Sequence, residues 1–260
     1  MKIVVCIKQV PDTTEVKLDP VTGTLIREGV PSIINPDDKS GLEAALSMKD
    51  LYGAHVTVLT MGPQQADLAL REALAMGADE AILLTDRAFA GADTLATSTT
   101  LAAAIRKLDY DLVIAGRQAI DGDTAQVGPQ IADHLDLPQI SYVCDLEKKD
   151  DKFIVKRQFE DGYHILEVEA PCLITTLSEM NTPRYMHVGG IMSAYADKVV
   201  QKWTLEDIDV DITKIGLKGS PTKVKKSFTK GAKQAGKKHE VTAQEAGKLI
   251  ALKLREKFVI

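Results

Sequence analysis

Short apolar runs recur along the first half of the chain. Residues 2–10, up to Pro11, are rich in Val and Ile, and similar runs follow at residues 55–60, 81–84 and 112–115. Runs of this kind are typical of strands that are buried on both faces of a parallel sheet. We therefore expect a fully buried strand at each of them.

Segments with helical spacing separate these runs. Asn35, followed by a proline and two acids, marks the start of a helix that Gly53 ends. Further helices are expected up to Gly77, from about Asp93, and up to about Leu135. Strand and helix thus alternate repeatedly, which predicts an α/β fold with a doubly wound, mostly parallel sheet. In such folds, ligands bind beyond the carboxyl ends of the strands.

The pattern changes after Pro138. Residues 152–156, 165–168 and 173–176 are strand-like, and no helical segment separates them. We expect them to pair antiparallel, as strands added to the same sheet. A hairpin is also expected at residues 15–27, because alternating residues there flank a turn sequence that contains proline and glycine.

The last part of the chain lacks clear periodicity from residue 181 onward. Residues 214–239 hold nine lysines and no acid, a composition that cannot build a core alone. A final amphipathic helix follows, capped by Thr242. We therefore predict two regions, an α/β domain with its antiparallel extension at residues 1–200 and an arm ending in a docking helix at residues 201–260.

Composition and charge narrow the class of protein. Hydrophobic residues make up 45% and charged residues 27%, which fits a globular chain. The net charge of −5 is too mildly acidic to indicate general binding to nucleic acid or to an anionic membrane. No run of about 18 apolar residues could span a bilayer, and the N-terminal run is too short for a signal peptide. We expect a cytoplasmic protein with no membrane insertion and no nucleic-acid partner.

The cysteines and histidines argue against a metal centre or a nucleophile. Cys6, Cys144 and Cys172 are too widely spaced for a CxxC motif, and we interpret them as small buried hydrophobic residues. The five histidines show no paired metal spacing, and no serine or cysteine lies in a nucleophile elbow. Because no catalytic side chain is evident, we expect a bound cofactor to carry the chemistry.

Residues 116–129 form the most informative segment, GRQAIDGDTAQVGP. They leave a predicted strand and enter a predicted helix, so backbone N–H groups would face the ligand crevice, where a phosphate would fit. Arg117 offers a cation, and Thr124 and Gln126 offer hydrogen bonds. A capped Asp-Gly loop without a ligand explains the same residues, and the two common nucleotide motifs are absent. The side-chain hydroxyls within residues 93–98 also allow two interpretations. They could bind a further phosphate group, or they could form only the N-cap and polar face of a helix.

These segments together resemble the beta (small) subunit of the electron transfer flavoproteins. The resemblance covers nearly the whole chain and departs locally at His164, where the family pattern has Glu or Gln. It is carried by residues 2–11, Asn35-Pro36, residues 61–63, 73–79, 118–121, 155–175 and 183–185.

The resemblance implies a heterodimer with an alpha subunit that carries FAD, and a second nucleotide held by the beta subunit itself. That nucleotide is structural AMP in the respiratory type and a second FAD in the electron-bifurcating type of anaerobic bacteria, which the loop sequence DGDTAQVGP resembles. Thr94 and Thr97 would lie nearest the diphosphate. The residues implied at this site are Cys6, Asn35, Asp37, Asp38, Met61, Thr94, Thr97, Gly116, Arg117, Gln118, Asp121, Gly122, Asp123, Thr124, Ala125, Gln126 and Val127.

The implied reaction is electron bifurcation. NADH would give hydride to the beta FAD, one electron would pass through the alpha FAD to an acyl-CoA dehydrogenase-type flavoenzyme, and the other would reduce ferredoxin or flavodoxin. Neither a metal nor a catalytic side chain is implied.

The resemblance also implies a surface for the dehydrogenase, at Arg184, Tyr185, Val188, Ile191 and Met192, with Val188 as the apolar anchor. An ordinary surface loop is the alternative reading of these residues. For the whole chain, two alternatives remain open. One is a subunit that holds AMP and only scaffolds the alpha FAD, and the other is a nucleotide-binding regulatory protein of similar fold.

Overall fold

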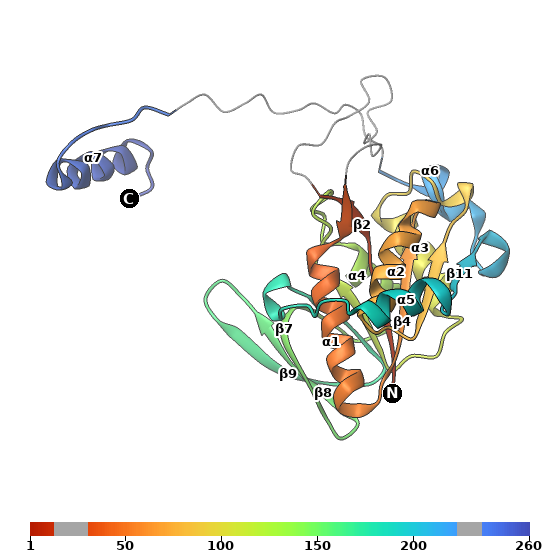
Figure 1. The fold of residues 1–260 in the computed structure, drawn as a ribbon. Helices are drawn as coiled ribbons and strands as arrows, with labels where there is room; N and C mark the ends of the chain where they lie inside the picture. Colours follow the sequence, from red (N-terminus) through yellow and green to blue (C-terminus); the bar gives the residue numbers. More distant parts are fainter. Residues whose placement is uncertain (13–30, 223–235) are drawn as a thin grey trace. The chain divides into compact units, whose positions relative to one another are not determined.

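A computed structural model describes residues 1–12, 31–222 and 236–260 of the chain (Figure 1). The chain divides into two compact units, Met1–Lys225 and Lys226–Ile260. The hairpin expected at residues 15–27 and much of the lysine-rich arm lie outside the described residues. Within the described part of the chain, no helix is both long and apolar enough to cross a membrane.

A sheet that has nine strands within the described residues forms the centre of the first unit. Its strands are β1 (Lys2–Cys6), β4 (His55–Met61), β5 (Glu80–Leu84), β6 (Leu112–Gly116), β7 (Gln139–Lys149), β8 (Lys152–Gln158), β9 (Tyr163–Glu169), β10 (Cys172–Thr176) and β11 (Val200–Trp203). Their order is β11-β5-β4-β1-β6-β10-β7-β8-β9. Neighbours from β11 to β7 are parallel, whereas β8 is antiparallel to both β7 and β9.

Helices pack on the sheet over two separate hydrophobic clusters. They are α1 (Pro36–Tyr52), α2 (Asp67–Met76), α3 (Thr94–Ile105), α4 (Val127–His134), α5 (Val188–Ala196) and the short α6 (Gly216–Gly219), while α7 (Ala243–Glu256) belongs to the second unit. Ile3 and Val5 of β1 join the cluster that α1, α2 and α5 share, helices that lie on one side of the sheet in Figure 1. Val4, between them, joins the cluster of α3 and α4. Burial on both faces explains why the central strands read as unbroken apolar runs.

Several predicted elements are confirmed, and with them the α/β class. The sheet is mostly parallel, antiparallel strands are added to it, and a helix lies near the C-terminus. Helix α1 ends where Gly53 adopts a left-handed φ of 67°, a conformation that favours glycine. Thr242 caps α7 through a reciprocal capping box with Glu245.

The first apolar run forms two strands instead of one. After β1, residues Gln9–Pro11 form β2, which pairs antiparallel with β3 (Ser32–Ile34) in a separate small sheet. The run is interrupted because the backbone N–H of Lys8 donates to the carboxylate of Asp38 at 2.7 Å instead of to a neighbouring strand.

The expectation for the later strands was wrong at β10. Strand β10 runs parallel to β6 and β7, because the chain returns to it through the β8–β9 hairpin. Strand β7 was missed, since only part of it is buried and its second half is polar. Helix α5 and strand β11 also form where no periodicity was found. Residue 200, the predicted boundary, begins β11 inside the main sheet, and the two compact units meet at Lys225 instead.

Candidate functional site

The residues predicted to bind a nucleotide gather at the carboxyl ends of the central parallel strands. Loop 117–126 leaves β6 and leads into α4, and the N-terminal residues of α1 lie beside it. This is the edge of an α/β sheet where ligands normally bind.

Asn35 fixes the conformation of the loop. Its side chain is fully buried, with the amide Nδ2 donating to the carbonyl of Gln118 at 2.8 Å and Oδ1 accepting from the N–H of Ile120 at 3.0 Å. It makes no side-chain cap of its own helix, α1. Because a buried amide left without these partners would be unfavourable, Asn35 and the loop hold one another in place.

Asp38 joins the ends of two neighbouring strands. Its carboxylate accepts from the N–H of Lys8 at 2.7 Å and from the N–H of Gly116 at 3.0 Å. Burial raises the pKa of Asp38 to about 7, although these hydrogen bonds oppose the rise. Gly116 has to be glycine, because a Cβ there would lie 2.1 Å from the Asp38 carboxylate.

Asp37 and Arg117 form a partly satisfied ion pair at the base of the loop. One Asp37 oxygen accepts from the N–H of Ser178 at 3.0 Å, and the other lies 3.3 Å from Arg117 Nε. Within the described residues, neither this oxygen nor Nε makes a hydrogen bond. The charge of Arg117 thus lies beside that of Asp37, and 34% of the Arg117 side chain remains exposed.

The loop itself turns sharply and leaves backbone donors free. Lys8 Nζ pairs with Asp121 at 2.6 Å, and Gln118 donates to Asp123 at 2.9 Å. Asp123 and Ala125 adopt φ values of 50° and 52°, in the left-handed region. In the described part of the chain, the backbone N–H groups of residues 124–126 have no protein acceptor.

Gly122 lies in open space. A Cβ there would meet no atom within 4 Å, so the described protein does not itself require a glycine. The close approach of a ligand, which the sequence suggested for this position, stays a prediction.

The start of α3 is connected to the same loop. Thr94 Oγ1 donates to Gln126 Oε1 at 2.8 Å, which links the beginnings of α3 and α4. Asp93 caps α3 by accepting from the N–H of Ala96 at 3.0 Å. Thr97 lies one turn further along α3, and no hydrogen bond joins its side chain to the described loop.

The remaining predicted residues differ in burial. Cys6 ends β1 and is buried, and this burial, with the charge of Asp38, raises the pKa of its thiol to about 12. The thiol is therefore protonated near neutral pH and does not act as a nucleophile. Met61 and Val127 are partly buried against the cluster of α3 and α4, and Thr124 is exposed.

Sequence reasoning missed two residues of this site. The first is Lys8, through its backbone N–H and its pair with Asp121. The second is Thr176, whose buried hydroxyl donates to the carbonyl of Asp37 at 2.9 Å. A polar residue at the carboxyl end of an apolar strand is a signal that could have identified Thr176. No side-chain pattern reveals the backbone contact of Lys8.

The residues predicted to contact a dehydrogenase lie on and just before α5. Tyr185, Val188 and Met192 expose 96%, 74% and 67% of their surface, and Ile191 is also exposed. Arg184 differs from them, because its guanidinium is held by Glu43 at 2.9 Å within the chain. It does not extend into solvent as the other predicted residues do.

Comparison with known proteins connects these features to one family. The family described as "Electron transfer flavoprotein domain" matches this chain over residues 22–208. The chain is 62% identical, over the full length of both chains, to "Electron transfer flavoprotein subunit beta" of Clostridium acetobutylicum. It is 58% identical to "Caffeyl-CoA reductase-Etf complex subunit CarD" of Acetobacterium woodii and 48% identical to "Acryloyl-CoA reductase electron transfer subunit gamma" of Anaerotignum propionicum, again over the full length of both chains. The chain therefore belongs to the electron transfer flavoprotein family, as a beta subunit.

Proposed function

We propose that this chain binds FAD at loop 117–126 and works as the redox subunit of an electron-bifurcating heterodimer. NADH is the electron donor. One electron passes through the FAD of the alpha subunit to an acyl-CoA dehydrogenase-type flavoenzyme, and the other passes to ferredoxin or flavodoxin.

The observation that carries the proposal is the way the N-terminus of α1 supports the loop. Asn35 accepts a hydrogen bond from a backbone N–H group within the loop. Asp38 accepts hydrogen bonds from backbone N–H groups at the strand ends beside the loop. The loop is thereby held with the backbone N–H groups of residues 124–126 unpaired in the described residues, beside the start of α4. Free N–H groups at a helix N-terminus are suited to binding phosphate.

A dinucleotide fits this arrangement better than AMP does. The beginnings of α3 and α4 are linked by Thr94 and Gln126, so two helix N-termini are available to a diphosphate. AMP carries a single phosphate and would need only one of them. The ion pair of Arg117 with Asp37, at 3.3 Å, keeps a cation at the base of the loop.

When bound, the flavin supplies hydride acceptance and one-electron transfer. The side chains of this chain hold and orient it. Asn35 and Asp38 position the loop, Arg117 contributes positive charge, and Cys6 stays a thiol.

The names of relatives support the assignment of the partners. Two relatives are named as parts of a caffeyl-CoA reductase-Etf complex and of acryloyl-CoA reductase. A flavoenzyme that acts on an acyl-CoA is therefore the natural partner for the exposed apolar residues of α5.

We further propose that the unit Lys226–Ile260 docks on the alpha subunit. Its helix α7 is amphipathic and has no buried residue, with Ile250 and Leu252 exposing 60% and 54% of their surface. Removal of Lys226–Ile260 should weaken assembly of the heterodimer. Unchanged assembly in analytical ultracentrifugation would contradict this part of the proposal.

The nucleotide content of the heterodimer tests the main proposal. The chain is co-purified with its alpha partner and denatured, and the released nucleotides are counted by chromatography against FAD and AMP standards. Two FAD per heterodimer, followed by NADH oxidation that requires both acceptors, is the expected result. One FAD and one AMP would contradict it and would reduce this chain to a structural partner.

A further inference from the structure

The exposed apolar residues around α5 belong to a segment whose backbone is held by hydrogen bonds and packing at its beginning, middle and end. We call residues 184–198 the docking segment. Tyr185, Val188, Met192 and Tyr195 expose between 60% and 96% of their surface. Apolar side chains on a mobile loop would lose conformational entropy on binding a partner. A segment that is already ordered avoids this cost, so the contacts that hold it affect the affinity for the partner.

Arg184 ties the beginning of the segment to α1. Its Nε and Nη2 donate to the two carboxylate oxygens of Glu43, both at 2.9 Å, and its backbone N–H donates to Glu43 at 3.0 Å. Nη2 also lies 2.9 Å from a carboxylate oxygen of Asp50, which lies further along α1 toward its C-terminus. Glu43 is buried, with only 10% of its side chain exposed. A bidentate pair of this kind fixes direction as well as distance.

The middle of the segment lies directly on α2. A Cβ at Gly190 would approach the carbonyl oxygen of Ala75 to 2.4 Å, so only glycine permits this contact. His187 Nδ1 accepts from the N–H of Gly190 at 2.9 Å and caps α5. The side chains of α5 therefore cannot shift far along α2.

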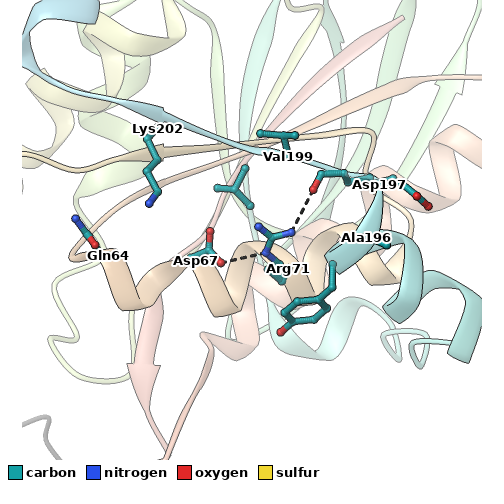
Figure 2. Close-up of a pocket in the computed structure, with 10 residues that line it drawn as sticks. Gln64, Asp67, Arg71, Ala196, Asp197, Val199 and Lys202 are labelled. Atoms are coloured by element: carbon teal, nitrogen blue, oxygen red, sulfur yellow. Dashed lines mark hydrogen bonds and ion pairs between the residues drawn. The ribbon is translucent and has the colours of Figure 1, made fainter.

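Arg71 of α2 ties the end of the segment, as Figure 2 shows. Its guanidinium donates to the carbonyl of Ala194 and, at 3.2 Å, to that of Lys198, while Nε donates to Asp67 at 3.1 Å. The ring of Tyr195 lies 5.3 Å from its central carbon. Arg71 lines an open hollow of about 570 Å³, but its Nε and Nη1 donors are used within the protein. We therefore interpret Arg71 as a brace for α5 and not as an anion site.

We propose that Arg184 and Arg71 are positioning residues that hold the docking segment preformed for the dehydrogenase-type partner. The inference rests on the proposed function, which gives this surface its partner. Because the two arginines fix the backbone at both ends, the apolar side chains between them meet the partner with little further ordering. Preorganisation of this kind improves affinity without adding contacts.

The test uses the intact heterodimer and compares Glu43→Gln and Arg71→Lys with the wild type. Each variant should raise the KM for the dehydrogenase about tenfold and leave kcat within about twofold. NADH-driven flavin reduction should be unchanged. Hydrogen exchange should accelerate at the amides of α5. Adding Arg184→Gln to Glu43→Gln should raise KM by less than the two single variants would together, since both remove the same ion pair and only the contact with Asp50 remains to be lost.

Two controls separate the possible outcomes. Asp109→Asn removes an exposed ion pair with Lys2 and should change neither KM nor exchange at α5. Val188→Glu alters the surface itself. If Val188→Glu raises KM while Glu43→Gln and Arg71→Lys leave both KM and exchange unchanged, the inference is wrong and the docking surface stands. If Val188→Glu has no effect either, the proposed docking surface is wrong together with the inference. A rise in KM without faster exchange would also overturn the inference, because it would indicate direct contact with the partner.

Discussion

The nucleotide loop and the docking segment are held by opposite chemistry. At the loop, buried acceptors on α1 hold backbone N–H groups, as Asn35 does for Ile120. At the docking segment, arginines donate to a carboxylate and to backbone carbonyls, as Arg71 does for Lys198. In the proposed function, the loop presents backbone N–H groups to the nucleotide, whereas the docking segment presents apolar side chains to the dehydrogenase-type partner.

This difference determines where each function is sensitive to mutation. In the loop, the important side chains are buried supports, and their loss should cost both stability and ligand binding. In the docking segment, the side chains that contact the partner are exposed, and they can be changed without loss of stability. The supports of the segment, Glu43 and Arg71, are predicted to affect docking because they order the segment without contacting the partner.

The largest effect is expected for Gly116→Val. A Cβ at this position would lie 2.1 Å from the Asp38 carboxylate and 2.8 Å from the Asp38 backbone nitrogen, so α1 and β6 would have to move apart. We expect a loss of about 3 kcal/mol or more in the free energy of unfolding, measured by urea denaturation. Gly122→Ala is the matched control and should change stability by less than about 0.5 kcal/mol. Equal losses for both variants would contradict the account of Gly116.

Asn35→Ala comes next. It removes a buried amide and leaves the Gln118 carbonyl and the Ile120 N–H without a partner. We expect a loss of about 2 kcal/mol in stability and loss of the nucleotide from the purified heterodimer. Asn181→Ala is the matched control, since Asn181 makes two hydrogen bonds to Ser40 on α1 away from the loop. If Asn181→Ala also released the nucleotide, Asn35 would have no specific role.

Val188→Glu should affect docking without affecting stability. Val188 exposes 74% of its surface at the first position of α5, where an acid is tolerated by the helix dipole. Loss of an apolar anchor costs about 2 kcal/mol or more in binding, which is about thirtyfold in the KM for the dehydrogenase. Ile212→Glu, at a 60% exposed position outside the segment, should leave KM unchanged. A similar rise in KM for Ile212→Glu would indicate a general charge effect.

The smallest effect is the pH dependence that Asp38 contributes. Its pKa is raised from an ordinary 3.8 to about 7 in the folded protein, so the folded state binds more protons than the unfolded state between these values. Stability therefore falls progressively as the pH rises from about 4 to about 7, because Asp38 ionises more readily in the unfolded state than in the folded state.

Asp38→Asn mimics the protonated carboxyl group and should remove the contribution of Asp38 to the pH dependence of stability. The stability of Asp38→Asn relative to the wild type should increase by about 1 kcal/mol between pH 5 and pH 6 in urea denaturation. A difference that does not depend on pH would mean that Asp38 is already ionised throughout this range.

The sequence predicted the central α/β unit and most of the site for physical reasons. Strands such as β1 and β4 are buried on both faces, so their apolar runs are unmistakable. The supports at Asn35 and Asp38 stand at the start of a helix with clear capping signals. The resemblance to a known family then ordered these segments into one site.

Elements that depend on tertiary contacts could not be predicted. Strand β7 is only partly buried, and its pairing with β10 depends on a neighbour that is distant in the sequence. Helix α5 is short and, apart from Ala194, not buried, so no amphipathic pattern marks it. The ion pair of Arg184 could not be predicted either, because its partner, Glu43, lies far away along the chain.

The most direct test of the account measures both sites on the same preparations of heterodimer. Nucleotide content and the Kd for the dehydrogenase-type partner are determined for wild type, Asn35→Ala and Val188→Glu. The account predicts that Asn35→Ala loses the second nucleotide and keeps its Kd, while Val188→Glu keeps two FAD and binds the partner about thirtyfold more weakly. If either variant lost both properties, or if the wild type released AMP instead of a second FAD, the account of two separate sites serving electron bifurcation would be contradicted.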